Sequence, residues 1–464
     1  MRARLALLSL ALGLSVSAGA ANPEARPEAL RALVQARVAA EYPSLEAIYR
    51  DLHAHPELSF LEVRTAGIVA NELRALGITV TEHVGNTGVV GVLRNGQGPT
   101  VMVRADMDAL PIREETGLPY ASKVEMDDLA GRRQPVMHAC AHDAHIAGFI
   151  GTARTLVGLQ AHWSGTVLFV AQPAEEIGGG ALAMLNDGLF ERFPAPDYAL
   201  ALHVWGSLPA GVIGFAEGPT YANVDSVDIL VRGYGGHGSR PHLTKDPIVL
   251  AAEIVTALQT IVSRELEPGT PAVVTVGSIH GGTKHNIIPD DVKLQLTLRS
   301  YSDPVADHLI GSIRRICENL ARAAGVSEDR LPVVTMAEQR TPSVYNDPTL
   351  TRRLTGSFRQ WFGENRVVPE KPTTGGEDFA RYGRTNRRIP LSIWWVGGQD
   401  PAKIEANLRT GAPLPWNHSA QFAPVPEPTL KAAVTSMTAA VLDLLGKPAA
   451  QERGADARGR PAGY

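Results

Sequence analysis

The sequence predicts an α/β fold of two domains, with the second domain inserted into the first. Three observations support this prediction. With 464 residues the chain is too long for one ordinary core, and with 44% hydrophobic residues it is too apolar for disorder. Short runs of Val, Ile, Leu and Phe alternate with helical segments in two separate stretches of the chain. Between these stretches the pattern changes to strand, helix, strand, strand, helix, strand.

The first domain is expected to be discontinuous and to cover residues 40–223 and 339–446. Continuous apolar runs of this kind are typical of strands that are buried on both faces. We therefore expect a mixed sheet with helices on both faces. The elements expected in the first part are helices at 45–53 and 66–76 and strands at 100–104, 166–172 and 198–204.

The inserted domain is expected over residues 224–338. Its order of elements is that of the ferredoxin-like α+β split unit. A compact unit inserted in this way can act as a lid over the larger domain. Its expected elements are strands at 226–232, 272–279, 292–300 and 331–337 and helices at 247–266 and 306–323.

Both ends of the chain are expected to lie outside these domains. Arg2 and Arg4 precede an apolar run at 5–16, and the small residues at 18–20 match a signal-peptidase site. Residues 1–20 are therefore expected to be a signal peptide, and the mature protein to be exported, either periplasmic or secreted, and free of the membrane. An uncleaved anchor is the alternative, but the run is shorter than the roughly 20 residues of a spanning helix. Residues 447–464 lack periodicity and are expected to be a flexible tail.

The composition excludes several classes of function. Lys and Arg number 44 against 48 Asp and Glu, and no basic run is present, so nucleic-acid binding is not expected. Two cysteines, Cys140 and Cys317, cannot build a disulfide framework or a four-cysteine zinc module. The chemistry is therefore expected among the 14 histidines and the Asp and Glu residues.

Polar side chains follow the ends of three predicted strands. Asp106 and Asp108 follow the first, Glu175 and Glu176 follow the second, and His203 ends the third. Open α/β sheets place their sites just beyond the carboxyl ends of their strands. Adjacent carboxylates point in opposite directions, so one can bind a metal ion while the other reaches a water molecule. A pair of Glu residues on a solvated turn is the alternative interpretation.

Cys140 and His142 form the densest part of the candidate site. A thiolate and an imidazole at this spacing can bind one divalent ion, with Zn²⁺ preferred and Mn²⁺, Co²⁺ or Ni²⁺ as alternatives. The pair alone also allows a buried inert cysteine or a nucleophilic cysteine activated by histidine. His203 and His418, each taken alone, are more typical of core histidines. Because all of these features fall at one edge of one domain, we expect a metal site.

The sequence resembles the M20 metallopeptidase and amidohydrolase superfamily. The resemblance is strongest to the branch of hippurate hydrolases, N-acyl-amino-acid amidohydrolases and plant auxin-conjugate hydrolases, and it runs from about residue 45 to about residue 445. Each block is weak alone, whereas the ordered set is highly specific. The blocks are 51–58, 104–111, 137–145, 172–176, 201–205, 235–242, 286–289, 375–379 and 416–419.

The resemblance implies two divalent metal ions that the thiolate of Cys140 bridges. In such a site Cys140 forms no disulfide with Cys317, which is expected on the apolar face of its helix. Ala141 and Gly375-Gly376 depart from the pattern of the family, and a positive φ at Ala141 would be unfavourable, but neither change removes a ligand. The side chains that would complete the two coordination shells are His142, Glu176, His203 and His418.

The resemblance also implies roles for residues that bind no metal. Glu175 would be the general base, and Asp108 would orient a metal ligand. His237 of the inserted domain would stabilise the oxyanion, in many members from the other subunit. That arrangement requires a homodimer through the inserted domain, and the alternative is a monomer whose own lid supplies His237. Asn286 and Arg299 would bind the carboxylate of the substrate.

The expected function is that of an exported metal-dependent amidohydrolase. It would cleave N-acyl amino acids, such as hippurate-like amides, to a carboxylic acid and an amino acid, with Glu175 accepting a proton from the attacking water. One alternative is a dipeptidase or aminopeptidase of the same fold that acts on short peptides. The other is a non-catalytic exported solute-binding or metal-binding protein. The pair of Glu175 and Glu176 favours an enzyme, because a pure binder needs no base beside a ligand.

Overall fold

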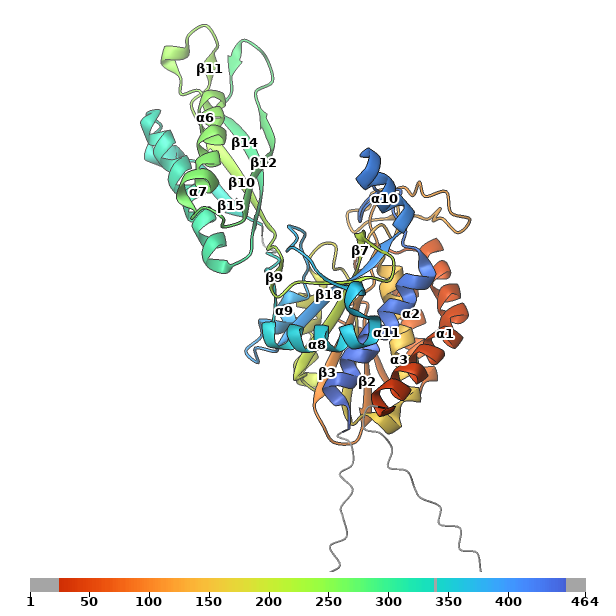
Figure 1. The fold of residues 1–464 in the computed structure, drawn as a ribbon. Helices are drawn as coiled ribbons and strands as arrows, with labels where there is room; N and C mark the ends of the chain where they lie inside the picture. Colours follow the sequence, from red (N-terminus) through yellow and green to blue (C-terminus); the bar gives the residue numbers. More distant parts are fainter. Residues whose placement is uncertain (1–24, 338–339, 448–464) are drawn as a thin grey trace, which may run out of the picture.

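Two β-sheets organise the chain in the computed structural model, which describes residues 25–337 and 340–447. An eight-stranded sheet covered by helices forms the larger unit. A four-stranded sheet with two helices, residues 225–336, stands apart from it and is here termed the four-stranded unit (Figure 1). The predicted signal peptide at 1–20 and the predicted tail beyond Lys447 lie outside the described residues.

Four adjacent parallel strands form the centre of the large sheet. Val101 of β3 lies opposite Val167 of β6 on one side and Tyr198 of β7 on the other. The outer strands include antiparallel pairs, so the sheet is mixed, as predicted. In spatial order the strands are β1 (Thr79–Val84), β2 (Gly88–Asn95), β6 (Gly165–Gln172), β3 (Thr100–Asp106), β7 (Tyr198–Pro209), β18 (Leu391–Gln399), β8 (Ile213–Phe215) and β17 (Val367–Pro369).

The two faces of this sheet bury separate cores. Along β3, Val101 and Val103 pack on one face and Met102 packs on the other, because successive side chains of a strand point in opposite directions. Helices cover both faces, which confirms the predicted fold class. The first face carries α1 (Ala25–Ala54), α2 (Val63–Ala75), α3 (His142–Gly158), α8 (Pro348–Phe362) and α11 (Pro426–Leu445), and the second carries α4 (Gly180–Asn186), α5 (Leu189–Arg192) and α9 (Ala380–Gly383).

The first helix is longer than the sequence predicts. The expected helix at 45–53 is only the end of α1, which starts at Ala25 and continues through Pro43. Proline removes one helical hydrogen bond, and for this reason it suggests a boundary. Val34 and Val38 nevertheless lie fully or almost fully buried in the core of the larger unit. Their packing against the rest of the fold stabilises the helical segment before the proline.

The four-stranded unit has the predicted order of elements. Its strands pair antiparallel throughout, and along β14 buried and exposed residues alternate, so the helices cover one face of the sheet. Cys317 of α7 is buried in this core and, like Cys140, is a free cysteine, as predicted. The strands in spatial order are β12 (Ala272–Gly281), β14 (Asp291–Ser300), β10 (Asp225–Arg232) and β15 (Val333–Met336), and the helices are α6 (Pro247–Thr260) and α7 (Asp303–Ala323).

Short elements complete the described part of the chain. A π-helical turn, Ile261–Glu265, follows α6 where the sequence predicts further α-helix. Among the described residues, the stretch Pro247–Glu265 has the length and composition of a membrane-spanning helix. The other elements are β4 (Glu125–Asp127), β5 (Arg133–Pro135), β9 (Gly218–Tyr221), β11 (Gly236–His237), β13 (Ile287–Ile288), β16 (Val344–Asn346) and α10 (Pro401–Thr410).

Two connections join the units, and they run side by side. The N–H of Val224 donates to the carbonyl of Thr341 at 2.8 Å, and the N–H of Thr341 donates to the carbonyl of Val224 at 3.1 Å. Val224 and Thr341 line one cavity with Glu175 and Glu176, which follow the carboxyl end of β6. The four-stranded unit is therefore attached at the edge where the sequence predicts a site (Figure 1).

Candidate metal centre and active site

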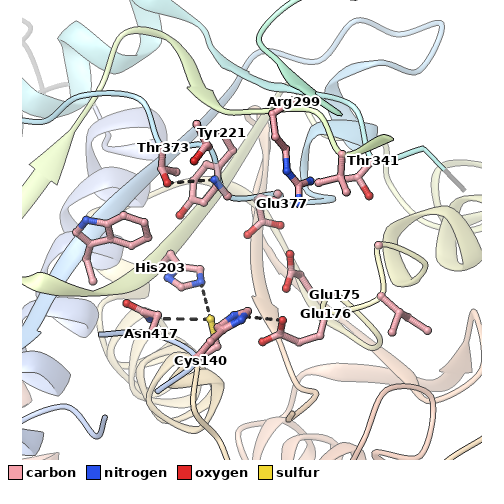
Figure 2. A pocket seen from close by; sticks show the side chains of 18 of the residues that line it. Cys140, Glu175, Glu176, His203, Tyr221, Arg299, Thr341, Thr373, Glu377 and Asn417 are labelled. Carbon is pink, nitrogen blue, oxygen red and sulfur yellow. Dashed lines mark hydrogen bonds and ion pairs between the residues drawn. The ribbon is translucent and has the colours of Figure 1, made fainter. Parts of the chain in front are cut away.

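A cavity of about 700 Å³ opens at the carboxyl ends of the parallel strands. Its lining combines residues of the larger unit, among them Cys140, Glu175 and His203, with residues of the four-stranded unit and its connections, among them Arg299 and Thr341. Figure 2 shows the guanidinium of Arg299 reaching into the cavity from the side opposite Cys140. The predicted site is thus a cavity that both units enclose.

The structure brings all five predicted metal ligands together. Cys140 Sγ lies 3.4 Å from His203 Nε2, and His418 Nε2 lies 3.4 Å from Glu176 Oε2. His142 and Glu176 form a close group with the predicted base, Glu175. Two further groups, each with all ligand atoms within 4.8 Å of one another, consist of predicted ligands alone, and Cys140 belongs to both. One group is Cys140, His142 and His203, and the other is Cys140, Glu176 and His418.

Two buried ligand atoms have no hydrogen-bond partner. His142 Nε2 and Glu176 Oε1 lie 3.8 Å apart, and each is buried without a partner among the described residues. A buried polar atom without a partner is unfavourable by about 1–3 kcal/mol. A cation between these two atoms would satisfy both of them.

Burial raises the pKa values of two predicted ligands. Burial raises the pKa of Glu176 to about 8, and burial together with the charge of Glu176 raises the pKa of Cys140 well above its usual value. Without a cation, both groups would be mainly protonated at neutral pH. A divalent ion stabilises the thiolate and the carboxylate and displaces their protons. The sulfur, nitrogen and oxygen donors of this site therefore fit the divalent metal ions that the sequence predicts.

Backbone carbonyls orient the two buried histidine ligands. Nδ1 of His142 lies 2.7 Å from the carbonyl oxygen of Asp108, and Nδ1 of His203 lies 2.7 Å from the carbonyl oxygen of Val204. Each Nδ1 then carries the proton, and each Nε2 is left with a lone pair for a metal. The neighbouring His145 is not available in this way, because its two nitrogens contact Asp106 at 2.5 Å and the N–H of Val204 at 2.7 Å.

Asp108 does more than the sequence predicts. Its carbonyl orients His142, and its carboxylate accepts hydrogen bonds from the backbone N–H of Glu175 at 3.1 Å and of Glu176 at 3.0 Å. The hydroxyl of Ser59 donates a further bond to it at 2.6 Å. Asp108 therefore fixes one predicted metal ligand and the backbone of the pair that carries the predicted base.

The predicted base, Glu175, lies beside the ligand cluster and faces the cavity (Figure 2). Burial raises its pKa well above the usual value, and the neighbouring carboxylates of Glu377 and Glu176 add to this effect. A cation held by the neighbouring ligands would favour the ionised carboxylate, which can accept a proton from water and release it later.

The three remaining predicted residues lie in two different places. Arg299 lines the cavity, and its buried Nη1 has no hydrogen-bond partner among the described residues. His237 and Asn286 are exposed and lie next to each other, where β11 pairs with β13 at the outer end of the four-stranded unit (Figure 1). The N–H of Gly238 donates to the carbonyl of Asn286 at 2.9 Å. Within one chain the structure does not bring His237 or Asn286 to the cavity.

A buried charged network beneath the cavity was not predicted. Arg104 is 1% exposed and contacts Asp106 at 2.6 Å, Glu377 at 2.9 Å and Asp378 at 3.3 Å. Glu377 also lines the cavity. The block at 375–379 carries this residue, but sequence alone does not show that an arginine of a distant strand balances its charge.

Comparisons with known proteins identify the family of this chain. The profile of peptidase family M20/M25/M40 matches residues 102–407. Thermostable carboxypeptidase 1 of Saccharolobus solfataricus is 37% identical over 83% of this chain and 91% of its own length. Hippurate hydrolase of Campylobacter jejuni is 37% identical over 72% of this chain and 83% of its own length.

A solved structure shares the fold along nearly the whole described chain. It is the crystal structure of the Bacillus subtilis YXEP protein, a dinuclear metal binding peptidase from the M20 family. It matches with a TM-score of 0.70 at 32% identity, over 88% of this chain and 99% of that chain. The family profile covers Cys140, Glu175 and His203. The chain therefore belongs to peptidase family M20/M25/M40 and is a metal-dependent hydrolase of amide bonds.

Proposed function

We propose that this chain hydrolyses N-acyl amino acids, such as hippurate-like amides, to a carboxylic acid and an amino acid. The observation that carries the proposal is one cavity with a ligand cluster and a carboxylate base on one side and a guanidinium without a partner on the other. The similarity to a hippurate hydrolase supports the same substrate class. Membership of a peptidase family argues against the alternative of a non-catalytic binding protein.

Two divalent ions are the proposed cofactors, with Zn²⁺ preferred and Mn²⁺, Co²⁺ or Ni²⁺ as alternatives. Cys140 would be shared between them, with His142, Glu176, His203 and His418 as the remaining ligands, because the ligand atoms form two groups with Cys140 in common. When bound, such ions supply a Lewis acid that polarises the amide carbonyl and makes a water molecule more acidic.

Glu175 would transfer the proton of the reaction. Its carboxylate accepts a proton from the attacking water, whose oxygen bonds to the acyl carbon. When the C–N bond breaks, Glu175 donates this proton to the nitrogen that leaves. The products are a carboxylic acid and an amine, and Glu175 ends in its starting form.

Arg299 would select substrates with a free carboxylate. A guanidinium binds a carboxylate through two parallel hydrogen bonds, and this one lies at the cavity with Nη1 unpaired within the described residues. An aminopeptidase would need an anion for the ammonium group of its substrate. Besides Glu175 and Glu176, Glu377 is the acidic residue that lines the cavity, but it is paired with Arg104 at 2.9 Å. The structure thus supports N-acyl amino acids over the alternative of an aminopeptidase or dipeptidase.

The experiment is a substrate panel on metal-stripped protein that is refilled separately with Zn²⁺, Mn²⁺, Co²⁺ and Ni²⁺. We expect hydrolysis of hippurate and N-acetyl amino acids, and little hydrolysis of N-methylbenzamide, which lacks the carboxylate. Arg299→Ala should raise KM for hippurate and leave hydrolysis of N-methylbenzamide unchanged. Faster hydrolysis of free dipeptides than of N-acyl amino acids would instead support a dipeptidase.

We further propose that residues 224–338 form a lid and dimerisation domain, and that His237 and Asn286 act in the cavity of a partner subunit. The support is their exposed position at the outer end of the four-stranded unit, away from the cavity of their own chain (Figure 1). Sedimentation of the mature protein would show a dimer. A monomer with full activity would contradict this part of the proposal.

We also propose that the protein is exported, because residues 1–20 have the pattern of a signal peptide. Mass spectrometry of the protein from cell fractions tests this. The expected result is a chain in the periplasm or the medium that begins near residue 21, and an intact N-terminus in the cytoplasm would contradict it.

A further inference from the structure

Glu62 is a buried carboxylate that no sequence motif singles out. It is the N-cap residue of α2 and is 0% exposed, but its side chain makes no capping bond to that helix. Oε1 accepts hydrogen bonds from the backbone N–H of Ala174 at 2.8 Å and of Phe60 at 2.9 Å, and Oε2 accepts one from the hydroxyl of Thr87. Glu62 thus contacts Ala174, the residue directly before the predicted base, Glu175.

Ala174 has an unfavourable backbone conformation. Its φ is +49°, in the left-handed region that residues other than glycine rarely adopt. The carbonyl of Ala174 accepts hydrogen bonds from the N–H of Gly179 at 3.1 Å and of Gly180 at 3.0 Å, which close a turn after β6. This turn directs Glu175 and Glu176 into the cavity. A turn that includes a strained residue needs contacts that hold it in place.

Two carboxylates hold three consecutive N–H groups of this turn. Glu62 binds the N–H of Ala174, and Asp108 binds those of Glu175 and Glu176. Glu62 has no basic partner among the described residues, and burying a carboxylate without one is unfavourable. Its contribution therefore lies in its hydrogen bonds and not in charge pairing.

We propose that Glu62 is a positioning residue for amide hydrolysis, which fixes the turn that presents Glu175 and Glu176. It lies outside the lining of the cavity and acts through the backbone of Ala174. The inference rests on the roles proposed for Glu175 and Glu176. The turn requires an acceptor atom at the position of Oε1, so the length of the side chain matters and its charge does not.

Three variants of Glu62 separate reach from charge. Glu62→Gln keeps an acceptor oxygen at the same reach, so kcat should stay close to that of the wild type. Glu62→Asp keeps the charge but is one methylene shorter, and Glu62→Ala removes the acceptor. For these two, kcat should fall about 100-fold at saturating metal with KM little changed, as for a misplaced catalytic group. If the Ala variant does not fold, the other two variants still test the proposal. A positioning role predicts a higher kcat for Glu62→Gln than for Glu62→Asp, whereas a role of the charge predicts the reverse.

Glu57→Ala is the matched control. The carboxylate of Glu57 accepts hydrogen bonds from the N–H of Arg64 at 2.9 Å and of Thr65 at 2.8 Å, so it stabilises the same helix without a contact to the turn. We expect this variant to lose thermal stability while kcat is retained. Equal loss of kcat in the Glu57 and Glu62 variants would contradict a positioning role.

Rescue by glycine is the second arm of the experiment. Glycine adopts a positive φ without strain, so Glu62→Ala combined with Ala174→Gly should recover part of the lost kcat. No rescue, together with wild-type kcat in Glu62→Asp, would overturn the proposal. The proposed role of Glu175 is assayed separately with Glu175→Gln in the wild-type background. An active Glu175→Gln variant would refute that role, whereas an inactive one beside a fully active Glu62→Ala would refute only the inference on Glu62.

Discussion

Left-handed residues cluster around the ligand site. Ala141, Ala174 and His418 have φ angles of 65°, 49° and 68°, and each lies at or beside a residue that lines the cavity. This conformation costs a residue other than glycine roughly 1–2 kcal/mol. Ala141 therefore has the positive φ that would suit glycine at this position. Its buried methyl packs with Tyr49 and Phe422, which partly offsets the strain.

The strain at Ala141 can be measured with a pair of glycine variants. In Ala141→Gly, the relief of about 1 kcal/mol of strain and the loss of about 0.8 kcal/mol of methyl burial nearly cancel. We expect the free energy of unfolding to change by less than about 0.5 kcal/mol. Ala144 is equally buried and belongs to the same cluster, but it lies within α3. Ala144→Gly should cost about 2 kcal/mol, since helix propensity and methyl burial are both lost. Equal losses in urea denaturation of the two variants would contradict the account.

Helices α1 and α3 are joined by a buried histidine. Nδ1 of His53 in α1 lies 2.6 Å from Asp143 in α3, and Nε2 lies 3.0 Å from Glu114. Burial alone would lower the pKa of His53, but the hydrogen bonds to these two carboxylates outweigh it and raise the pKa to about 10. His53 therefore carries a proton in the folded protein at neutral pH. It fixes the start of α3, where the predicted ligand His142 lies next to Asp143.

Because of the contacts of His53 with Asp143 and Glu114, the free energy of unfolding should fall at alkaline pH. The unfolded-state pKa of histidine is about 6.5, below the folded-state value of about 10. The stabilisation by His53 is therefore fully present below pH 6.5, and it is lost as the pH rises through about 10. The difference in free energy of unfolding between the wild type and His53→Gln should shrink between pH 7 and pH 10.

Chemical denaturation at several pH values measures this difference. The control is His162→Gln, at an exposed histidine of the larger unit. This control removes a histidine that has no carboxylate partner among the described residues. A constant difference for His53→Gln would show that His53 is neutral in the folded state.

The arrangement of the whole molecule separates His237 from the cavity of its own chain. The four-stranded unit places Arg299 at the cavity and β11 at the opposite end of the unit (Figure 1). If His237 acts in the cavity of a partner, the Glu175→Gln and His237→Ala variants should complement each other. Each alone would be inactive, and a mixed dimer would have one site with both residues intact.

The complementation is measured by refolding or co-expressing the two variants and assaying hippurate hydrolysis. Activity of the mixture above that of either variant alone is the expected result. The control is a mixture of Glu175→Gln with a variant that carries both substitutions, which should stay inactive because no site then has both residues. Absence of activity in the first mixture, with mixed dimers present, would show that His237 does not act across subunits.

Residues at strand ends and in motifs were within reach of the sequence. Buried strands end in a predictable pattern, so Glu175 and His203 could be placed at one edge of a sheet from the sequence. The motif at 137–145 added Cys140. Glu62 and Arg104 could not be found in this way, because buried charged residues look like surface residues until their distant partners are known. The part of α1 before Pro43 was also missed. Proline indicates a helix boundary, but the packing of Val34 and Val38 stabilises the helix there. The place of His237 depends on how the units are arranged, which no local pattern encodes.

The proposed mechanism depends most on Glu175, which would bind and release the proton without holding a metal. The most direct measurement is kcat for hippurate, together with the metal content, of the Glu175→Gln variant. We expect bound metal equal to that of the wild type and a loss of kcat of about 10²- to 10⁴-fold, the usual contribution of a general base. Glu176→Gln, one residue away, should lose metal instead. Turnover at the wild-type rate in metal-loaded Glu175→Gln would contradict the mechanism.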